Sequence, residues 1–594
     1  MNIQHVEPPN WWTGMADNNL QIMIHGENVA QFEVSIRDKD VLLKKVNRAE
    51  SPNYLFLDVE IARDAKPGRF KIRFFDGGKR VGNYEYKLYE RKEGSANRLG
   101  FNNSDIIYLL MPDRFANGNP DNDNVKGMFE QMNRADHDGR HGGDIQGVID
   151  HLDYIKATGF TALWMNPVFE NNQEKYSYHG YSITDYYKVD ARLGSNDDYQ
   201  SMVDACHEKE IKVIKDMIFN HCGSKHWWME DLPFQDWVHQ FPEYTTSNYK
   251  ANVIIDPYVS EFDETKMLSG WFDRTMPDLN QRNEFLANYL IQNSIWWVEN
   301  FDLDGIRMDT YPYPYKEMMA RWSGRIMEEY PNFRIVGEIW DGNPSVVAYW
   351  KSRNKYSGYA SNLNTVFDFP LHDALKMALN EKETWNEGIV RLYSGLSQDY
   401  LYEDPEDHVV FCDNHDVARI AAVCNDDYQK VKQALIFIMT IRGTPLVYYG
   451  TEIGMSGLAD DHHGKIRRDF PGGWADDQNN AFNENSRYRL QKEMHKFTQN
   501  LIRIRKGNEV LQTGKLKHFI PENGVYVYFR YLEDEVVMIA LNNGTKEQTL
   551  DLERFDEVLK NYSSAFHLYT GVEHPLKDGL GINGNGFLLI SLKK

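Results

Sequence analysis

The sequence predicts an α/β protein, a (β/α)8 TIM barrel with a β-sandwich domain on each side of it. Between residues 105 and 450, eight short apolar runs typical of buried strands alternate with segments of helical spacing. Before and after this region, apolar and polar residues alternate with the period of two that half-buried strands require. The predicted domains are residues 1–95, 96–505 and 506–594.

The N-terminal β-sandwich is predicted from short alternating runs between residues 20 and 89, which are separated by turn residues such as Gly77 and Gly78. The polar segment 91–100 that follows is interpreted as a linker. Similar alternating runs in residues 506–594 predict a C-terminal β-sandwich.

The barrel strands are expected at 105–112, 160–167, 212–219, 304–309, 334–340, 365–370, 408–416 and 444–450. Helical spacing lies between them, for example at Leu286, Leu290 and Trp297. Residues 222–276, after the third strand, are too many for a barrel loop and predict an inserted subdomain. Residues 455–487, after the eighth strand, form a second long excursion.

Composition limits the functions that the 594-residue chain can have. Its formal net charge of −22 argues against nucleic acid or an anionic membrane as a partner. No apolar run reaches the ~20 residues of a membrane-spanning helix, and no apolar signal segment is seen at the start. The localisation stays open: cytoplasmic by default, or periplasmic if a signal was trimmed. The four cysteines lack metal-site spacing and are expected to be packing thiols.

Polar residues at strand ends are the candidate functional residues, because barrels of this kind build their sites on the loops after the strands. They are Asp216, Asn220, His221, Arg307, Asp309, Glu338, Asn414, His415 and Asp416. Arg307 and Asp309 lie two positions apart on one strand and project the same way, so Arg307 is expected to keep Asp309 ionised.

Carboxylates combined with His and Arg, without a serine or cysteine nucleophile motif, suit glycosidic bond cleavage. Glu338, after an apolar run, is the better candidate for the acid, and Asp309 is the better candidate for the nucleophile. A metal-dependent amidohydrolase would need a His-x-His pair after the first strand, which the sequence lacks. A non-catalytic carbohydrate-binding protein would be expected to have lost one of the carboxylates.

Four blocks resemble, in order and spacing, the signature regions of the α-amylase family of glycoside hydrolases. They are DMIFNH (216–221), GIRMD (305–309), GEIW (337–340) and FCDNHD (411–416). MPDLN (276–280) and the N-terminal sandwich resemble the cyclomaltodextrinase, neopullulanase and maltogenic amylase group. WWTGM (11–15) and RRDFPGGW (467–474) are similar to the Bacteroidetes-type members of that group.

The resemblance implies retaining, double-displacement hydrolysis of α-1,4-glucosidic bonds in cyclodextrins, pullulan or maltooligosaccharides. Asp309 would be the nucleophile, Glu338 the general acid/base and Asp416 the carboxylate that holds the distorted sugar. The implied substrate-binding residues are His179, Tyr181, His221, Arg307 and His415. A glucan transferase or isomerase of the family, or a starch-degrading α-amylase, remains an alternative. Asp216 and Asn220 would shape the site from behind.

Asn and Asp residues are close together in segment 116–124, and a Gly-Gly-Asp follows at 142–144. Composition alone favours a polar turn here. The resemblance instead implies a structural Ca²⁺ ion. Its ligands would be Asn117, Asn119, Asn122, Asp123, Gly142 and Asp144. No organic cofactor is expected, the expected partner is an α-glucan oligosaccharide, and a homodimer is a hypothesis.

Two features do not follow from the resemblance. Many α-amylases carry Lys-His after the nucleophile, whereas this chain has Thr310 and Tyr311, so recognition on the leaving-group side does not transfer. The pair Trp296–Trp297 is expected in the core because it lies inside a helical pattern. Trp227 and Trp228 lie in the insertion, and the sequence does not decide whether they stack on sugar or pack in the protein.

Overall fold

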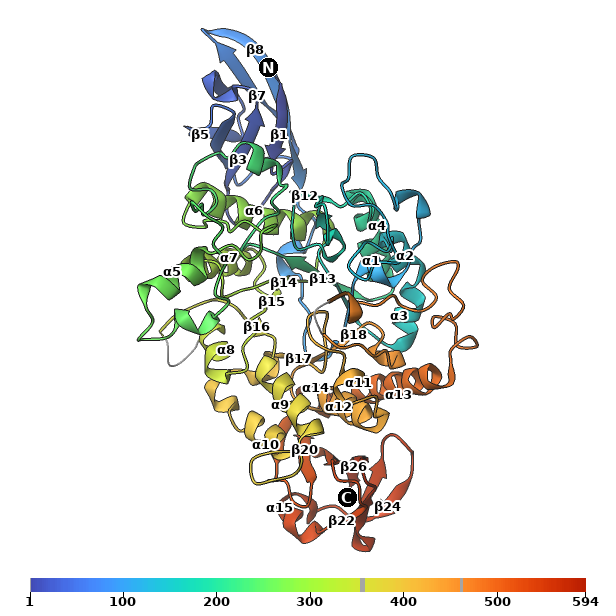
Figure 1. Cartoon of the computed structure of the whole chain (residues 1–594). Coiled ribbons are helices and arrows are strands. Elements are labelled where there is room, and N and C mark those ends of the chain that lie inside the picture. The colour runs from blue at the N-terminus through green and yellow to red at the C-terminus, as the bar shows by residue number, and fades with distance from the viewer. Residues whose placement is uncertain (1, 353–357, 460–462) are drawn as a thin grey trace.

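The computed structural model describes residues 2–352, 358–459 and 463–594. An N-terminal β-domain lies at one end of the molecule, the barrel lies in the middle and a C-terminal β-domain lies at the other end (Figure 1). The predicted fold class, a barrel flanked by two β-domains, is confirmed.

The N-terminal domain is a sandwich of two four-stranded sheets. One sheet contains, in spatial order, β1 (Ile3–Glu7), β3 (Asn19–Gly26), β6 (Tyr54–Ile61) and β5 (Val41–Arg48). The other contains β2 (Trp11–Thr13), β8 (Lys79–Glu90), β7 (Gly68–Asp76) and β4 (Glu33–Ile36). Alternate residues such as Ile22, Ile24 and Phe74 are fully buried between the sheets, which explains the period of two in the sequence.

The barrel contains eight strands, and the hydrogen-bonded neighbours among them pair in parallel. In chain order they are β9 (Ile107–Leu110), β10 (Ala162–Met165), β13 (Lys212–Met217), β14 (Gly305–Met308), β15 (Arg334–Gly337), β16 (Thr365–Val366), β17 (Val409–Phe411) and β18 (Thr444–Tyr448). A parallel bridge between Phe367 and Val409 joins the two ends of this sheet and closes the barrel. Each strand lies within a predicted run and is shorter than it, because the apolar residues continue into buried loops.

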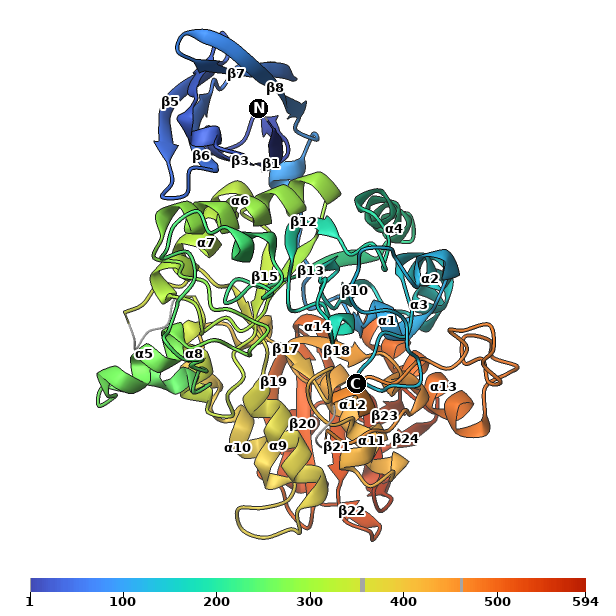
Figure 2. The same ribbon diagram turned by 45° about the horizontal axis from the view of Figure 1, so that its top comes forward.

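Helices surround the barrel strands, as Figure 2 shows. They are α1 (Pro112–Phe115), α2 (Ile145–Asp150), α3 (Leu152–Thr158), α4 (Asn196–Glu208), α6 (Glu284–Phe301), α7 (Lys316–Glu329), α8 (Pro344–Trp350), α9 (Phe369–Asn380), α10 (Val390–Leu396), α11 (Ile420–Val423), α12 (Tyr428–Thr440), α13 (Arg489–Lys506) and α14 (Glu509–Thr513). Side-chain caps fix several starts: Ser195 forms a capping box with Asp198 on α4, and Asn283 accepts two backbone N–H groups of α6. Trp296 and Trp297 are buried in α6, which confirms their core placement.

The insertion after β13 contains α5 (Glu261–Ser269) and short 3-10 turns at Trp227–Glu230 and Ala251–Ile254. Trp228 is fully buried, and the ring of Trp227 stacks on His5 of the N-terminal domain with 4.0 Å between ring centroids. Trp227 therefore packs the insertion against the sandwich, whereas Trp228 packs against Tyr186 and Tyr289 of the barrel, and the packing interpretation is the correct one for both. A two-stranded ribbon, β11 (Phe169–Glu170) with β12 (Asp185–Val189), follows β10.

The segment 91–100 connects sandwich and barrel, but it is packed and is not a free linker. Arg91 Nη1 lies 2.5 Å from Glu329 Oε1, and Arg91 Nε lies 3.3 Å from Glu299 Oε2. Ser95 Oγ donates to Glu299 Oε1 at 2.6 Å, and Arg98 Nη2 lies 3.7 Å from Glu299 Oε2. Both glutamates are buried barrel residues, so this charged seam fixes the sandwich on α6 and α7.

The C-terminal domain pairs a six-stranded sheet with a two-stranded one. The larger sheet contains β19 (Lys515–His518), β20 (Val525–Leu532), β21 (Glu535–Asn542), β26 (Phe587–Lys593), β23 (Ser564–His567) and β24 (Glu573–Pro575). The smaller contains β22 (Gln548–Leu550) and β25 (Leu580–Ile582). The short helix α15 (Asp556–Leu559) follows β22 in the chain and precedes β23. Gln433 of α12 donates to the carbonyls of Asn542 and Gly586, which ties this domain to the barrel.

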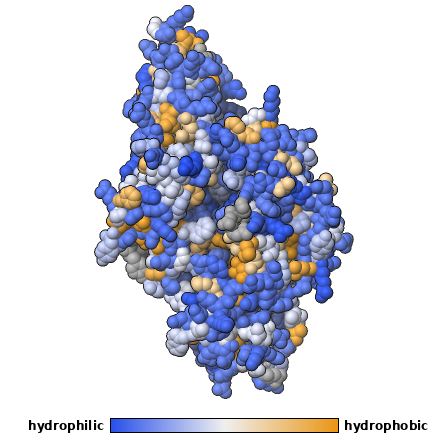
Figure 3. Space-filling model, viewed as in Figure 1, coloured by the Kyte–Doolittle hydropathy of each residue, from blue (hydrophilic) through white to orange (hydrophobic). Residues whose placement is uncertain are grey.

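All four cysteines are buried and free, as expected. Within the three described stretches of chain, no helix combines the length and the apolar character that crossing a membrane requires. The face seen in Figure 3 is mainly hydrophilic, with apolar residues in small separate groups, and it is hollowed near its middle, over the barrel.

Candidate active site

A cavity of about 600 Å³ opens at the carboxyl ends of the barrel strands. Its lining residues are Asp138, Tyr176, Tyr178, His179, Tyr181, His221, Phe272, Asp273, Thr275, Met276, Asp309, Thr310, Tyr313, Glu338, Trp340, Asp416, His463 and Arg467. The strand register brings residues from distant parts of the sequence together here, since β13, β14 and β15 are neighbours in the sheet. All three carboxylates predicted to carry the chemistry are on this wall.

Arg307 lies at the centre of the carboxylate cluster. Its Nη1 lies 2.9 Å from Asp216 Oδ1 and 2.6 Å from Asp309 Oδ1, while its Nη2 lies 2.8 Å from Glu338 Oε2. The side chain is only 1% exposed. The sequence indicated one carboxylate partner for Arg307, and the structure shows three, because Asp216 is the cross-strand neighbour of Arg307 and Glu338 follows the next strand.

Two opposing effects set the pKa values of the clustered carboxyls: burial raises them, and the positive charge of Arg307 lowers them. Burial raises the pKa of Glu338 to about 7, with Arg307 opposing and the charge of Asp309 adding to the rise. Burial also raises the pKa of Asp309 to about 6, because the lowering effect of Arg307 is smaller. Arg307 therefore acts in the expected direction, but it does not outweigh burial. Of the two carboxyls, Glu338 retains a proton to the higher pH.

Asp416 has the opposite electrostatic environment. Its Oδ2 lies 2.9 Å from His415 Nε2, and its Oδ1 lies 2.7 Å from Arg467 Nη2. Burial raises the pKa of Asp416, but the charges and hydrogen bonds of His415 and Arg467 lower it more, so the net pKa is lowered. Asp416 is therefore an ionised carboxylate, and the cavity contains carboxyl groups with different proton affinities.

Arg467 was not identified from the sequence as a site residue. It comes from the excursion after the eighth strand, donates from Nε to the carbonyl of His415 at 2.8 Å, and holds the hydroxyl of Tyr178 at 3.3 Å. It is the first residue of RRDFPGGW, a motif that carried the family resemblance but did not indicate where the side chains of this segment point. A loop without periodicity gives no such indication.

The predicted substrate-binding residues fall into two groups. His179, Tyr181 and His221 line the cavity, whereas Arg307 and His415 are buried behind the wall. His415 Nε2 contacts Asp416 and also lies 2.7 Å from the Tyr181 hydroxyl, so His415 orients wall residues. Burial lowers the pKa of His221 to about 4, so its imidazole is neutral at pH 7, with Nε2 donating to the carbonyl of Tyr181 at 3.1 Å and Nδ1 left as the acceptor.

Asp216 and Asn220, expected behind the site, are buried there. Asp216 Oδ2 accepts hydrogen bonds from Trp164 Nε1 and from the Tyr181 hydroxyl, and Asn220 Nδ2 lies 3.3 Å from His221 Nδ1. Neither side chain lines the cavity, and both instead position residues that do, Tyr181 and His221.

Aromatic rings form much of the cavity wall and were missed in the sequence. They are Tyr176, Tyr178, Phe272, Tyr313 and Trp340. Trp340 is 53% exposed and stacks on Phe369 with 5.5 Å between centroids, which leaves its other face open. Flat, partly exposed rings with polar neighbours suit the apolar faces of sugar rings. The GEIW block contained one signal for this wall, because Trp340 lies two positions after Glu338.

The segment proposed to hold a metal fits an oxygen-binding cation only in part. The Oδ1 atoms of Asn117 and Asn122 are buried without a hydrogen-bond partner among the residues that the structure describes, and Gly142 packs so closely that a Cβ there would lie 2.4 Å from Asp123 Oδ1. The Asp144 carboxylate instead accepts the backbone N–H groups of Gly147, Gly118 and Asn119 at the start of α2.

Asn119, also a predicted ligand, uses its side-chain oxygen to accept from Asp121 N at 3.3 Å. Asn119 and Asp144 thus have capping roles whether or not a cation binds, and the six-residue ligand set stays a prediction.

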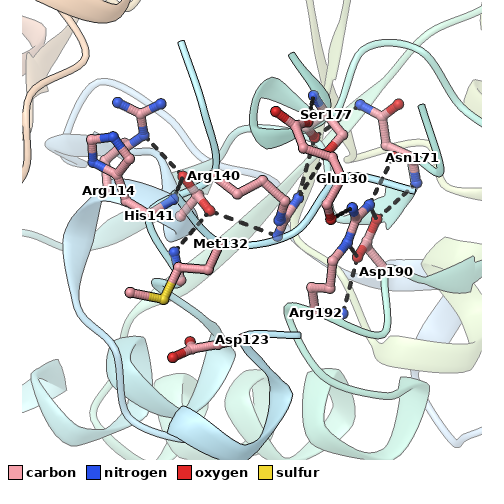
Figure 4. Close-up of polar contacts among 12 residues, drawn as sticks. Arg114, Asp123, Glu130, Met132, Arg140, His141, Asn171, Ser177, Asp190 and Arg192 are labelled. Carbon is pink, nitrogen blue, oxygen red and sulfur yellow. Dashed lines mark hydrogen bonds and ion pairs between the residues drawn. The ribbon is translucent and has the colours of Figure 1, made fainter. Parts of the chain in front are cut away.

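Buried hydrogen bonds, and the ion pairs of Asp113 with Arg114 and Arg140, connect this segment with the cavity wall (Figure 4). Gly142 N donates to Asp113 Oδ1 at 3.3 Å, and Arg140 Nη1 donates to the carbonyl of Ser177 at 3.3 Å. The Arg114 guanidinium lies 4.0 Å from the ring centroid of Tyr178, a wall residue. In Figure 4, Asp123 lies beside Met132 and apart from these pairs. The loop therefore supports the wall without contributing a catalytic group.

Family models match nearly all of the chain. The model "Alpha amylase, catalytic domain" matches residues 109–514, "Cyclomaltodextrinase, N-terminal" matches residues 5–92, and "Cyclo-malto-dextrinase C-terminal domain" matches residues 516–591. The three matches coincide with the barrel and its two flanking β-domains.

Individual proteins are also similar. A "Beta/alpha-amylase" of Paenibacillus polymyxa is 30% identical over 82% of this chain, but the chain spans only 37% of the length of that relative. A "Cyclomaltodextrinase" of Geobacillus thermopakistaniensis is 29% identical over 74% of this chain and 69% of its own length. The solved structure of an alpha-amylase from Geobacillus thermoleovorans, complexed with acarbose, is 28% identical with a TM-score of 0.67 and covers 83% of this chain and 99% of its own.

Proposed function

Because the chain belongs to the α-amylase family of glycoside hydrolases, we propose that it hydrolyses α-1,4-glucosidic bonds of cyclodextrins, pullulan or maltooligosaccharides by double displacement. The observation that carries the proposal is the pair Asp309 and Glu338, held by adjacent nitrogens of one guanidinium on the wall of the cavity. This arrangement keeps the two carboxyls close, as a retaining mechanism requires.

In the proposed reaction, Glu338 donates its proton to the leaving glycosidic oxygen while Asp309 forms a bond to the sugar carbon. Water then attacks this glycosyl ester, and Glu338 takes the proton from the water. The ionised Asp416, held by Arg467 and His415, stabilises the positive charge that develops on the sugar ring.

The cavity walls support a preference for small or cyclic substrates. Loops after several strands contribute lining residues, among them Asp138, Tyr176, Phe272 and His463, so the cavity is bounded on several sides. A long branched polymer would enter such a space less readily than a ring or a short chain.

Initial rates on β-cyclodextrin, pullulan and soluble starch test this proposal. We expect faster turnover of β-cyclodextrin than of starch at equal mass concentration. The Asp309→Asn variant, purified in the same way, is the control for contaminating activity. Faster turnover of starch would contradict the substrate preference, and hydrolysis of none of the three would contradict the proposed function.

We also propose a structural Ca²⁺ ion in the segment of Asn117, Asn122, Asp123 and Gly142. Calcium that binds only the folded chain adds about 2.7 kcal/mol at a free concentration 100 times Kd. We therefore expect a chelator to lower the melting temperature of the wild type and added Ca²⁺ to restore it. An Asp123→Ala variant should melt at a lower temperature and lose this response.

The matched control for the calcium experiment is Asp121→Ala, since Asp121 is exposed in the same segment and is not a proposed ligand. Its response to chelator should equal that of the wild type. The calcium proposal would be contradicted if elemental analysis finds no calcium in the wild-type protein and its melting temperature is the same with and without Ca²⁺. The segment would then be a polar turn. Homodimer formation stays a separate hypothesis, which the molar mass in solution checks.

A further inference from the structure

Thr310, the residue after Asp309, has an unusual backbone conformation. Its φ of 42° lies in the left-handed region, which a β-branched residue rarely adopts. The neighbouring peptide groups are regular, because Asp309 N donates to the carbonyl of Met217 and Tyr311 N donates to the carbonyl of Glu338. The strained conformation is therefore confined to one residue, which lies on the cavity wall.

Thr310 touches both carboxyls of the proposed catalytic pair. Its backbone N–H donates to Glu338 Oε2 at 2.9 Å, and its hydroxyl donates to Asp309 Oδ2 at 3.1 Å. Two different donors of a single residue thus hold two different carboxyls. The φ of 42° sets where the Thr310 side chain lies relative to the peptide plane that carries this N–H, and in this conformation the hydroxyl lies beside Asp309 while the N–H faces Glu338.

The contacts of Glu338 also locate its proton. Its Oε2 accepts from Thr310 N at 2.9 Å and lies 2.8 Å from Arg307 Nη2. An oxygen that accepts two hydrogen bonds is a poor place for the acidic proton. The proton of the acid form is therefore expected on Oε1, the oxygen that these donors leave free.

We propose that Thr310 is a positioning residue whose N–H keeps the acidic proton on Glu338 Oε1 and whose hydroxyl aims the Asp309 carboxylate at the sugar carbon. The inference rests on the proposed roles of Asp309 and Glu338. When the glycosidic bond breaks, the Oε1 proton passes to the leaving oxygen, and an Asp309 oxygen forms the new bond to the sugar carbon.

Thr310→Val tests the hydroxyl, because valine has nearly the same shape and removes only the donor. We expect kcat to fall about 10-fold, the size of effect that a hydrogen bond to a charged group has. Removing a donor disfavours the ionised form of Asp309, so the acid limb of the pH profile of kcat/KM should move upward by about half a pH unit.

Other charged and titratable groups face Asp309 from the surrounding elements and stay unchanged in this variant. They are Arg307, Asp216, Glu338, Asp416, Tyr181 and Tyr313. A movement of the acid limb would therefore report on the Thr310 hydroxyl. Thr310→Ser keeps that donor and should restore both kcat and the wild-type pH profile.

The matched control is Thr451→Val, which removes a similar threonine donor from the buried Asp413, a carboxylate outside the cavity. It should lower the melting temperature but leave the acid limb in place. If Thr310→Val does not fold, Thr310→Ala removes the same hydroxyl without the β-branch. An unchanged kcat and acid limb in the folded hydroxyl-deficient variant would overturn the inference, as would an equal loss in Thr310→Ser.

Failure of this inference is distinguishable from failure of the proposed function. A mechanism-based fluoroglycosyl inhibitor should label Asp309 of the wild type, as peptide mass spectrometry would show. Labelled Asp309 with a normal Thr310→Val profile would overturn only the role of Thr310. Label on another residue would overturn the proposed nucleophile, and the inference with it.

Discussion

Replacing Asp309 with asparagine is expected to reduce kcat by about 10⁴-fold while the fold stays intact. The amide keeps the shape of the side chain, but it cannot form a stable glycosyl ester with the sugar, so the double displacement loses its first step. Steady-state rates on β-cyclodextrin measure the loss. Mass spectrometry of the quenched enzyme should show the covalent intermediate in the wild type and not in the variant.

The control for this variant is Asp304→Asn, at the opposite end of the same strand. Asp304 pairs with His207 and accepts from Val213 N, far along the strand from the cavity wall. Its loss should affect stability and leave kcat within a factor of about two. Near-normal turnover in Asp309→Asn would contradict the nucleophile assignment.

Replacing Glu338 with glutamine is expected to reduce kcat on β-cyclodextrin by about 10²–10⁴-fold, the usual contribution of a general acid. The effect should depend on the leaving group. An aryl maltoside whose phenol leaves without protonation should form the intermediate almost as fast as with the wild type. Glutamine retains a carbonyl oxygen that is able to accept from Thr310 N and Arg307, so the surrounding side chains stay in place.

The same variant gives a test by pH. Glu338 must be protonated to act as an acid, and burial raises its pKa to about 7, so wild-type kcat/KM should fall as the pH rises through this value. Asp309 must be ionised, so activity should also fall as the pH drops below about 6. In Glu338→Gln the alkaline limb should disappear. A retained alkaline limb would assign the acid to another group.

Much of the barrel was predictable because its strands are buried on both faces and read as unbroken apolar runs between amphipathic helices. Asp309 and Glu338 were also predictable, since they follow strands whose ends meet at one face. Arg467 was not, because its position depends on how a long aperiodic loop folds back over the strand ends. The protonation of Asp309 was predicted in part only, since a sequence shows the nearby cation but not the depth of burial.

The aromatic residues show the same limit. Trp296 and Trp297 lie in a helical pattern and were predicted correctly as core residues. Trp227 and Trp228 lie in an irregular insertion, where only the three-dimensional contacts show that Trp227 packs on His5 of the N-terminal domain and Trp228 on Tyr289 of α6. For the sugar-facing rings, such as Trp340, the sequence contained the residue but not the exposed face.

The N-terminal sandwich is not a module that can be exchanged freely between relatives. Glu299 and Glu329 belong to the barrel, whereas their cationic partners Arg91 and Arg98 arrive from the connecting segment. Breaking one such buried pair typically costs about 3–5 kcal/mol, because the remaining charge stays uncompensated. A chimaera that joins this barrel to a foreign sandwich would therefore need to keep the connecting segment with both arginines, and changes in this segment and in the barrel have to occur together during evolution.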